Sequence, residues 1–225
     1  MFRLVHEDPR FFLIDKQAGV SFHHQGEETG LVEAVRAGLG EVWPVHRLDR
    51  MTSGLLLLAR SPDVARALSQ QLAERQMDKL YLALSDRKPG KKQGLISGDM
   101  LKGRGGAWRL TSAQHQPART RFLSTSLQPG IRLFFLKPLT GKTHQLRVAM
   151  KSLGAPILGD PLYHPASQPP VDRGYLHAWS LRFRLGEEVF DFECPPTEGE
   201  WFRLPALHAL LTQADWRPAN LRDRL

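Results

Sequence analysis

Residues 46–59 read His-Arg-Leu-Asp-Arg-Met-Thr-Ser-Gly-Leu-Leu-Leu-Leu-Ala, and no other stretch says as much about the fold. Its second half, from Gly54 to Ala59, is a continuous apolar run of the kind found in buried strands. Asp49 stands just before this run, between Arg47 and Arg50, where neighbouring cations favour the ionised carboxylate. The pattern alone is as compatible with a structural ion pair as with a functional carboxylate.

Strand-like segments dominate the rest of the chain and arrive largely in pairs. We expect strands over 11–14, 80–84, 120–127, 131–137, 176–185 and 189–193. We expect helices over 31–39, from Ser61 onward, over 143–153 and over 203–212, followed by a frayed tail at 222–225. This order predicts an α+β fold, with a mixed, mainly antiparallel β-sheet flanked by helices. No composition shift marks a linker, so we expect one catalytic domain over residues 1–225.

Positive charge is the most informative feature of the composition. The chain of 225 residues has a formal net charge of +8, which attracts phosphate polymers. Many basic side chains lie between residues 86 and 109, among several glycines. We expect this segment to be a mobile loop that contacts an RNA backbone, while a solvated loop without a partner stays open as the alternative. A second loop is expected over 165–174.

Several classes of protein are excluded by simple counts. No apolar run is long enough for a membrane helix, and the first residues are too charged for a signal peptide. Cys194 is the single cysteine, so the chain forms no internal disulfide and no thiolate metal cluster. The adjacent pair His23-His24 has poor spacing for one metal ion. We therefore expect a cytoplasmic protein that uses no metal and no organic cofactor.

Six short motifs follow one another in the order of a known family. They are Asp15–Val20, His46–Asp49 with Thr52–Gly54, Lys79–Tyr81, Gly141–Arg147, Gly159–Tyr163 and Leu176–Ala178. Together they resemble the signature of the RluA-type pseudouridine synthases, and six motifs in order are far more specific than one. Gln17 departs from the family pattern, which has proline at that place. No S4-like RNA-binding module is expected before these motifs.

The resemblance implies a mixed β-sheet core with a central catalytic cleft and a role for several named side chains. Asp49 is implied to be the catalytic aspartate, Tyr81 to line the uracil pocket, and Arg147 to be the ion-pair partner of the aspartate. We also assign substrate binding to Arg47 and Lys142, and supporting roles to His46, His144 and Gln145.

These residue types suit the reaction that the resemblance implies. Pseudouridine formation breaks the N1–C1′ bond, turns the uracil and joins C5 to C1′, so it requires no redox step and no added group. An ionised Asp49 is able to attack the sugar as a nucleophile or to remove a sugar proton, and both routes stay open. The uridine must first leave its stack in the RNA, which costs a few kcal/mol. An aromatic face such as Tyr81 is able to return about 1–3 kcal/mol by stacking on the base.

The resemblance favours ribosomal RNA over transfer RNA as the substrate, and we expect a monomer. One competing hypothesis is a catalytically inactive RNA-binding protein on the same fold, which predicts loss of the aspartate or the arginine. Asp49, Tyr81 and Arg147 are all present. A second is an unrelated hydrolase or kinase, but the chain has neither a Gly-x-Ser-x-Gly motif nor an Asp-Phe-Gly segment. His177 is expected to be a hydrogen-bonded core histidine.

Overall fold

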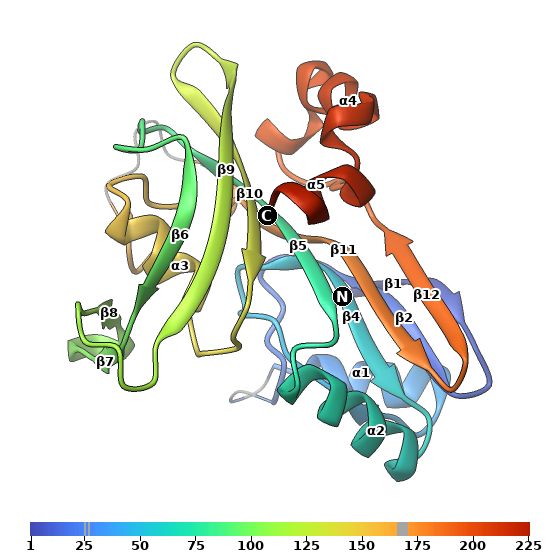
Figure 1. Cartoon of the computed structure of the whole chain (residues 1–225). Coiled ribbons are helices and arrows are strands. Elements are labelled where there is room, and N and C mark those ends of the chain that lie inside the picture. Colours follow the sequence, from blue (N-terminus) through green and yellow to red (C-terminus); the bar gives the residue numbers. More distant parts are fainter. Residues whose placement is uncertain (25, 27, 166–170) are drawn as a thin grey trace. The chain divides into compact units, whose positions relative to one another are not determined.

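The chain divides into two compact units in a computed structural model that describes residues 1–24, 26, 28–165 and 171–225 (Figure 1). The first unit comprises Met1–Lys79 and His177–Pro196, and the second comprises Leu80–Leu176 and Thr197–Leu225. The chain passes between the units three times, after Lys79, after Leu176 and after Pro196. The single catalytic domain expected from the sequence stays a prediction.

The first unit is built on a mixed sheet whose strands are ordered β1, β2, β4, β11 and β12. All neighbours are antiparallel except β4 and β11, which pair in parallel at Ser53 and Gly54. The bounds are β1 Phe2–Glu7, β2 Phe11–Lys16, β4 Ser53–Ala59, β11 Leu176–Leu185 and β12 Glu188–Glu193, with a short β3 at Trp43–Pro44 beside β4.

Two helices cover this sheet because its central strands are apolar on both faces. Every residue of β4 is buried, as the continuous apolar run predicts. Leu68 of helix α2 (Pro62–Ala73) packs on one face, in a cluster with Phe11, Leu57 and Phe183. Helix α1 (Leu31–Leu39) has a buried apolar stripe of its own and ends at Gly40. The Ser61 side chain accepts a hydrogen bond from the Val64 N–H at 3.3 Å and caps α2.

The second unit contains an antiparallel sheet in the order β5, β10, β9 and β6, and a separate two-stranded hairpin of β7 and β8. The strands are β5 Asp78–Ser85, β6 Gln93–Gly98, β7 Met100–Lys102, β8 Trp108–Leu110, β9 Ala118–Gln128 and β10 Ile131–Pro138. The helices are α3 Gln145–Ser152, α4 Pro205–Thr212 and α5 Pro218–Arg224, with short 3-10 turns η1 Arg104–Gly106, η2 Trp201–Arg203 and η3 Ala214–Trp216.

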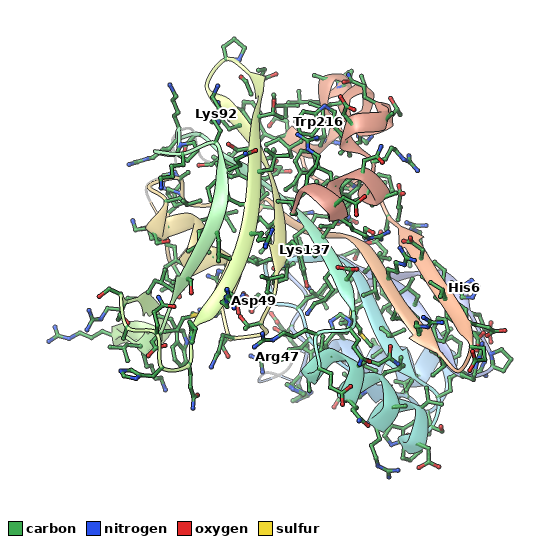
Figure 2. All side chains as sticks on the ribbon, viewed as in Figure 1. His6, Arg47, Asp49, Lys92, Lys137 and Trp216 are labelled. Atoms are coloured by element: carbon green, nitrogen blue, oxygen red, sulfur yellow. The ribbon has the colours of Figure 1, made fainter. Side chains whose placement is uncertain are left out.

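Strand register assigns side chains to the two faces of this sheet. Tyr81 stands opposite Leu136, which stands opposite Phe122, so these side chains share a face. Thr120, two residues along β9 from Phe122, lies on that face and bonds Gln145 of α3. Helix α3 and Tyr81 therefore belong to the same side of the sheet. On the opposite face the Trp216 ring stacks on Phe135, with centroids 5.2 Å apart (Trp216 is labelled in Figure 2).

The predicted α+β class is confirmed, and so are all of the predicted strand pairs. The hairpins 120–137 and 176–193 form as β9–β10 and β11–β12. The predicted mobile loop over 86–109 is wrong, because β6, β7 and most of β8 lie within it. The frayed tail at 222–225 is also wrong, since α5 runs to Arg224 and Leu225 is buried. The helix over 203–212 exists but is not the last one. Residues 166–170 of the loop predicted over 165–174 lie outside the described residues.

Two searches of the described residues gave no candidates. No helix among them has both the length and the apolar character that crossing a membrane requires. No group of three or more His, Cys, Asp or Glu side chains in the same residues is arranged to hold a metal ion.

Candidate active site

Asp49 lies on the loop that leads into β4, and hydrogen bonds hold this loop in place. Its carbonyl oxygen accepts the Thr52 N–H at 3.0 Å, which closes a turn. The Asp49 side chain is half-buried and the Arg47 side chain is exposed (both are labelled in Figure 2). Arg50, the other flanking arginine, donates to the Gly19 carbonyl at 2.9 Å and pairs with Glu28 at 3.3 Å. The carboxylate is thus presented by a loop with a defined backbone.

Lys16 also holds the loop that carries Asp49 in place. Its side chain is fully buried, and Nζ donates to the carbonyl oxygens of Gln17 at 2.8 Å, Val20 at 2.9 Å and Arg50 at 3.2 Å. A buried ammonium is costly unless hydrogen bonds satisfy it, and these three acceptors match its three donors. The Arg50 oxygen also accepts the Gly19 N–H at 2.8 Å. Lys16 therefore ties the turn after β2 to the loop that carries Asp49.

His46 has a structural contact and no charge at neutral pH. Its Nε2 accepts the backbone N–H of Leu57 in β4 at 3.1 Å, so the ring proton lies on Nδ1. Burial lowers the pKa of His46 to about 3, and the positive charge of Lys79 acts in the same direction. Burial also lowers the pKa of Lys79 to about 8. These contacts make His46 a neutral anchor between the Asp49 loop and β4.

The start of β4 is held against β11 by a close backbone approach and a buried histidine. Gly54 has a φ of +107°, and a Cβ at this position would lie 2.3 Å from the Ala178 carbonyl oxygen. His177 Nδ1 lies 2.7 Å from the Ser53 hydroxyl, and its Nε2 lies 2.7 Å from the Cys194 carbonyl oxygen. His177 is 2% exposed, which confirms the expected hydrogen-bonded core histidine.

Tyr81 belongs to the second unit and is buried in β5, on the side of the sheet that α3 covers. The loop before α3 is fixed by Gln145. Its Oε1 accepts from the Thr140 hydroxyl at 2.7 Å and the Lys142 N–H at 3.0 Å. Its Nε2 donates to the Arg119 carbonyl and the Thr120 hydroxyl, both at 3.0 Å. The amide therefore uses all of its hydrogen-bonding positions to join the loop to β9.

Arg147 points into the interior of the second unit and pairs there with Asp160, a residue to which the sequence alone assigns no role. Its Nε and one Nη donate to the two carboxylate oxygens of Asp160, at 2.8 and 2.9 Å. The Asp160 carboxylate is fully buried and also accepts the backbone N–H groups of Leu162 and Tyr163 at 2.9 and 3.0 Å. The pairing of Arg147 with Asp49 implied by the resemblance stays a prediction.

His144 and Lys142 lie on the loop that enters α3. His144 adopts a left-handed conformation with a φ of 56°, which is uncommon for a residue other than glycine. Its Nδ1 lies 3.0 Å from the Tyr163 hydroxyl. Lys142 is exposed, as a lysine that contacts phosphate must be.

Basic residues are concentrated in one part of the second unit. Residues 100–159 contain ten lysines and arginines and no acidic residue. Such a run gives a local positive potential that attracts a polyanion. A sequence model of the RNA pseudouridylate synthase family matches residues 10–152, the part of the chain that contains the Asp49 loop, Tyr81 and Arg147.

The chain belongs to the RNA pseudouridylate synthase family. It is 50% identical over 206 residues to an uncharacterized RNA pseudouridine synthase of Haemophilus influenzae, covering 91% of this chain and 92% of the relative. It is 34% identical to ribosomal large subunit pseudouridine synthase C of Haemophilus ducreyi, covering 83% of this chain and 63% of the relative. The solved structure of human RNA pseudouridylate synthase domain containing 1 superposes with a TM-score of 0.78 at 26% identity, over 99% of this chain and 95% of that one.

As an RNA pseudouridylate synthase the protein is an isomerase that acts on RNA. Lys16, Asp160 and Tyr163 lie within the family-like motifs, and the sequence alone assigns them no role. The signal that they share is their place within these motifs. Their partners were not readable, because Lys16 and Asp160 bond groups brought close by irregular turns.

Proposed function

We propose that this RNA pseudouridine synthase modifies a specific uridine of ribosomal RNA and that Asp49 is its catalytic aspartate. Three observations support Asp49. Its side chain is half-buried, and its loop is held by Lys16 and by the turn between Asp49 and Thr52. The loop also lies within the segment that matches the family. A reaction that moves a base on one sugar requires a carboxylate held at a fixed position. Asp49 meets this requirement by attack on C1′ or by removal of a sugar proton.

We assign binding of the flipped uridine to Tyr81, Arg147, Arg47 and Lys142. The Tyr81 ring stacks on the uracil, and Arg147 is the ion-pair partner of Asp49. Arg47, exposed two residues before Asp49, enters the space left by the base. Lys142 contacts a phosphate, and His46, His144 and Gln145 keep the surrounding loops in place.

The preference for ribosomal RNA is supported by the name of the Haemophilus ducreyi relative, a ribosomal large subunit enzyme at 34% identity. We further propose that the enzyme acts as a monomer in the cytoplasm. Pseudouridine mapping of ribosomal and transfer RNA from cells with and without the gene tests the substrate. A site lost from transfer RNA alone contradicts this part of the proposal.

The catalytic role is tested by tritium release from RNA labelled at C5 of uridine, using the Asp49→Asn variant. We expect loss of turnover with unchanged folding and little change in RNA affinity. Asp63→Asn is the matched control, because Asp63 is an exposed carboxylate of the same unit on α2 and should not affect turnover. Near-normal turnover by Asp49→Asn would show that another group performs the reaction.

A further inference from the structure

The hydroxyl group of Tyr163 joins three elements of the second unit. Tyr163 is 5% exposed, and its oxygen accepts the backbone N–H of Trp108 in β8 at 2.8 Å. The same oxygen lies 3.0 Å from Nδ1 of His144, the residue before α3. A tyrosine hydroxyl accepts one hydrogen bond and donates another, so both contacts are satisfied when Nδ1 carries no proton.

We propose that Tyr163 is a positioning residue that couples RNA binding at the β7–β8 hairpin to the placement of Arg147. This inference rests on the proposed function, because it assigns an RNA backbone as the hairpin's partner and a substrate role to Arg147. It adds a residue whose hydroxyl touches neither the RNA nor the uridine.

The hairpin needs such an anchor. A two-stranded ribbon is marginally stable in water on its own. Strands β7 and β8 form a sheet separate from the four-stranded one, with three residues each, and α3 packs against β8. The tip is closed by the Gly103 N–H, which donates to the Ala107 carbonyl at 2.7 Å. The bond from Trp108 to Tyr163 fixes the start of the second strand, next to the tip.

The chemistry of the hairpin fits a phosphate backbone. Lys102, Arg104 and Arg109 are exposed, and the hairpin contains no acidic residue. Each phosphate neutralised by such a side chain releases bound counterions, so RNA affinity falls with salt in proportion to the number of contacts. Phosphate contacts position a protein on RNA without reading its sequence. The proposed partner is therefore an RNA backbone, whatever the target uridine.

The other side of Tyr163 reaches Arg147. The guanidinium carbon of Arg147 lies 5.0 Å from the centroid of the Tyr163 ring, within the range of a cation–π contact. The Tyr163 N–H donates to the Asp160 carboxylate at 3.0 Å, the same carboxylate that binds Arg147. A shift of Tyr163 is therefore transmitted to Arg147 through the Tyr163 ring and through the Asp160 carboxylate. It is also transmitted to the left-handed residue His144, which contacts the Tyr163 hydroxyl.

Tyr163→Phe removes the hydroxyl and keeps the ring over Arg147. We expect affinity for a fluorescein-labelled 30-nucleotide RNA hairpin, measured by anisotropy, to fall on the order of fivefold. In an otherwise wild-type chain, the double substitution Lys102→Gln and Arg104→Gln should lower the affinity for this RNA and weaken the dependence of that affinity on salt. In the Tyr163→Phe background the same two changes should have a clearly smaller effect, because the hairpin is no longer held in place.

Tyr175→Phe is the matched control. Tyr175 is a buried tyrosine of the same unit whose hydroxyl also accepts a backbone N–H, from Trp201 at 3.1 Å, but it contacts neither the hairpin nor Arg147. In its background the effects of the two charge changes should be fully additive. Wild-type affinity in Tyr163→Phe, or additivity equal to that of Tyr175→Phe, overturns the proposal.

Measurements of turnover and of RNA binding together distinguish failure of this inference from failure of the proposed function. Tyr163→Phe should raise KM and lower kcat in the tritium-release assay, whereas a purely structural loss lowers the fraction of active enzyme and leaves KM unchanged. Binding of the labelled hairpin RNA does not require isomerisation, so an inactive wild-type protein would refute the function alone. If Tyr163→Phe does not fold, hydrogen exchange of the wild-type protein decides. RNA should then slow exchange both at 100–110 and at 160–164, and an effect at neither or at one alone contradicts the coupling.

Discussion

Arg147 and Asp160 form a two-pronged ion pair in the interior of the second unit, with Nε and Nη2 of the arginine 2.8 and 2.9 Å from the two carboxylate oxygens. The side chains of Arg147 and Asp160 are 7% and 0% exposed, so solvation by water compensates little for loss of the ion pair. The parallel geometry fixes the plane of the guanidinium, which a single contact does not do. Asp160 thereby orients an arginine that we propose to act on the substrate.

Asp160→Asn should destabilise the protein by about 3–5 kcal/mol, because it removes the buried carboxylate charge to which the Arg147 guanidinium donates two hydrogen bonds. Urea unfolding followed by circular dichroism measures the change in free energy. Asp63→Asn, which removes an exposed partner of Arg66 on α2, should cost less than about 1 kcal/mol. Equal effects of the two substitutions would contradict the assignment of a buried pair.

Gly54→Ala should destabilise the first unit by more than about 3 kcal/mol, because it combines a disfavoured backbone conformation with a backbone clash. The added Cβ would lie 2.3 Å from the Ala178 carbonyl oxygen, at a φ of +107°. Gly90→Ala is the control, since its Cβ meets no atom within 4 Å and its effect should stay within about 1 kcal/mol. Thermal unfolding of both variants provides the comparison.

Because His46 is neutral in the folded protein, the free energy of unfolding should depend on pH in the acid range. Burial lowers its pKa to about 3 from an ordinary value of 6.5, so between these values the unfolded chain binds a proton that the folded chain does not. Stability from this group is fully present above pH 6.5 and is lost as the pH falls toward 3, with a limiting slope of about 1.4 kcal/mol per pH unit. His46→Gln should flatten the curve of unfolding free energy between pH 4 and 6.5. Identical slopes for the two proteins would refute the buried neutral imidazole.

Lys142→Ala should weaken RNA binding uniformly across sequences and reduce the slope of log affinity against log salt by about one. Lys142 is exposed on the loop before α3, where Gln145 holds its backbone N–H at 3.0 Å. Arg66→Ala, an exposed cation of the first unit, is the control and should leave the slope unchanged. A loss of affinity that does not depend on salt would argue against a phosphate contact.

Local signals predicted much of the fold. The helix over 31–39 was predicted with its observed bounds, because its apolar spacing and the following Gly40 are both local features. The β9–β10 hairpin was readable from a turn at 128–130 between two strand-like segments. Strand β6 was missed, because Gln93–Gly98 has weak strand character and becomes a strand by pairing with β9, more than twenty residues later. Helix α5 was missed although Pro218 at its first turn is a start signal.

The sequence motifs name the candidate site residues but not the contacts that those residues make. The Asp49 loop, Tyr81 and Arg147 were all named from motifs. The fully buried Lys16 and Asp160 were not, since a charged side chain reads as exposed unless its partners are known. Those partners are backbone carbonyls in one case and a helix residue in the other, and neither follows from spacing along the chain.

The chain enters the second unit between Lys79 and Leu80, inside β5, leaves it between Leu176 and His177, inside β11, and returns to it after Pro196. Neither half is therefore encoded by one uninterrupted piece of the gene. A biotechnologist who wishes to exchange one unit between two such enzymes must cut the chain at three points, two of which lie inside strands whose register must be preserved. Simple end-to-end fusion therefore cannot exchange the two units, because each unit is made of separate stretches of the chain.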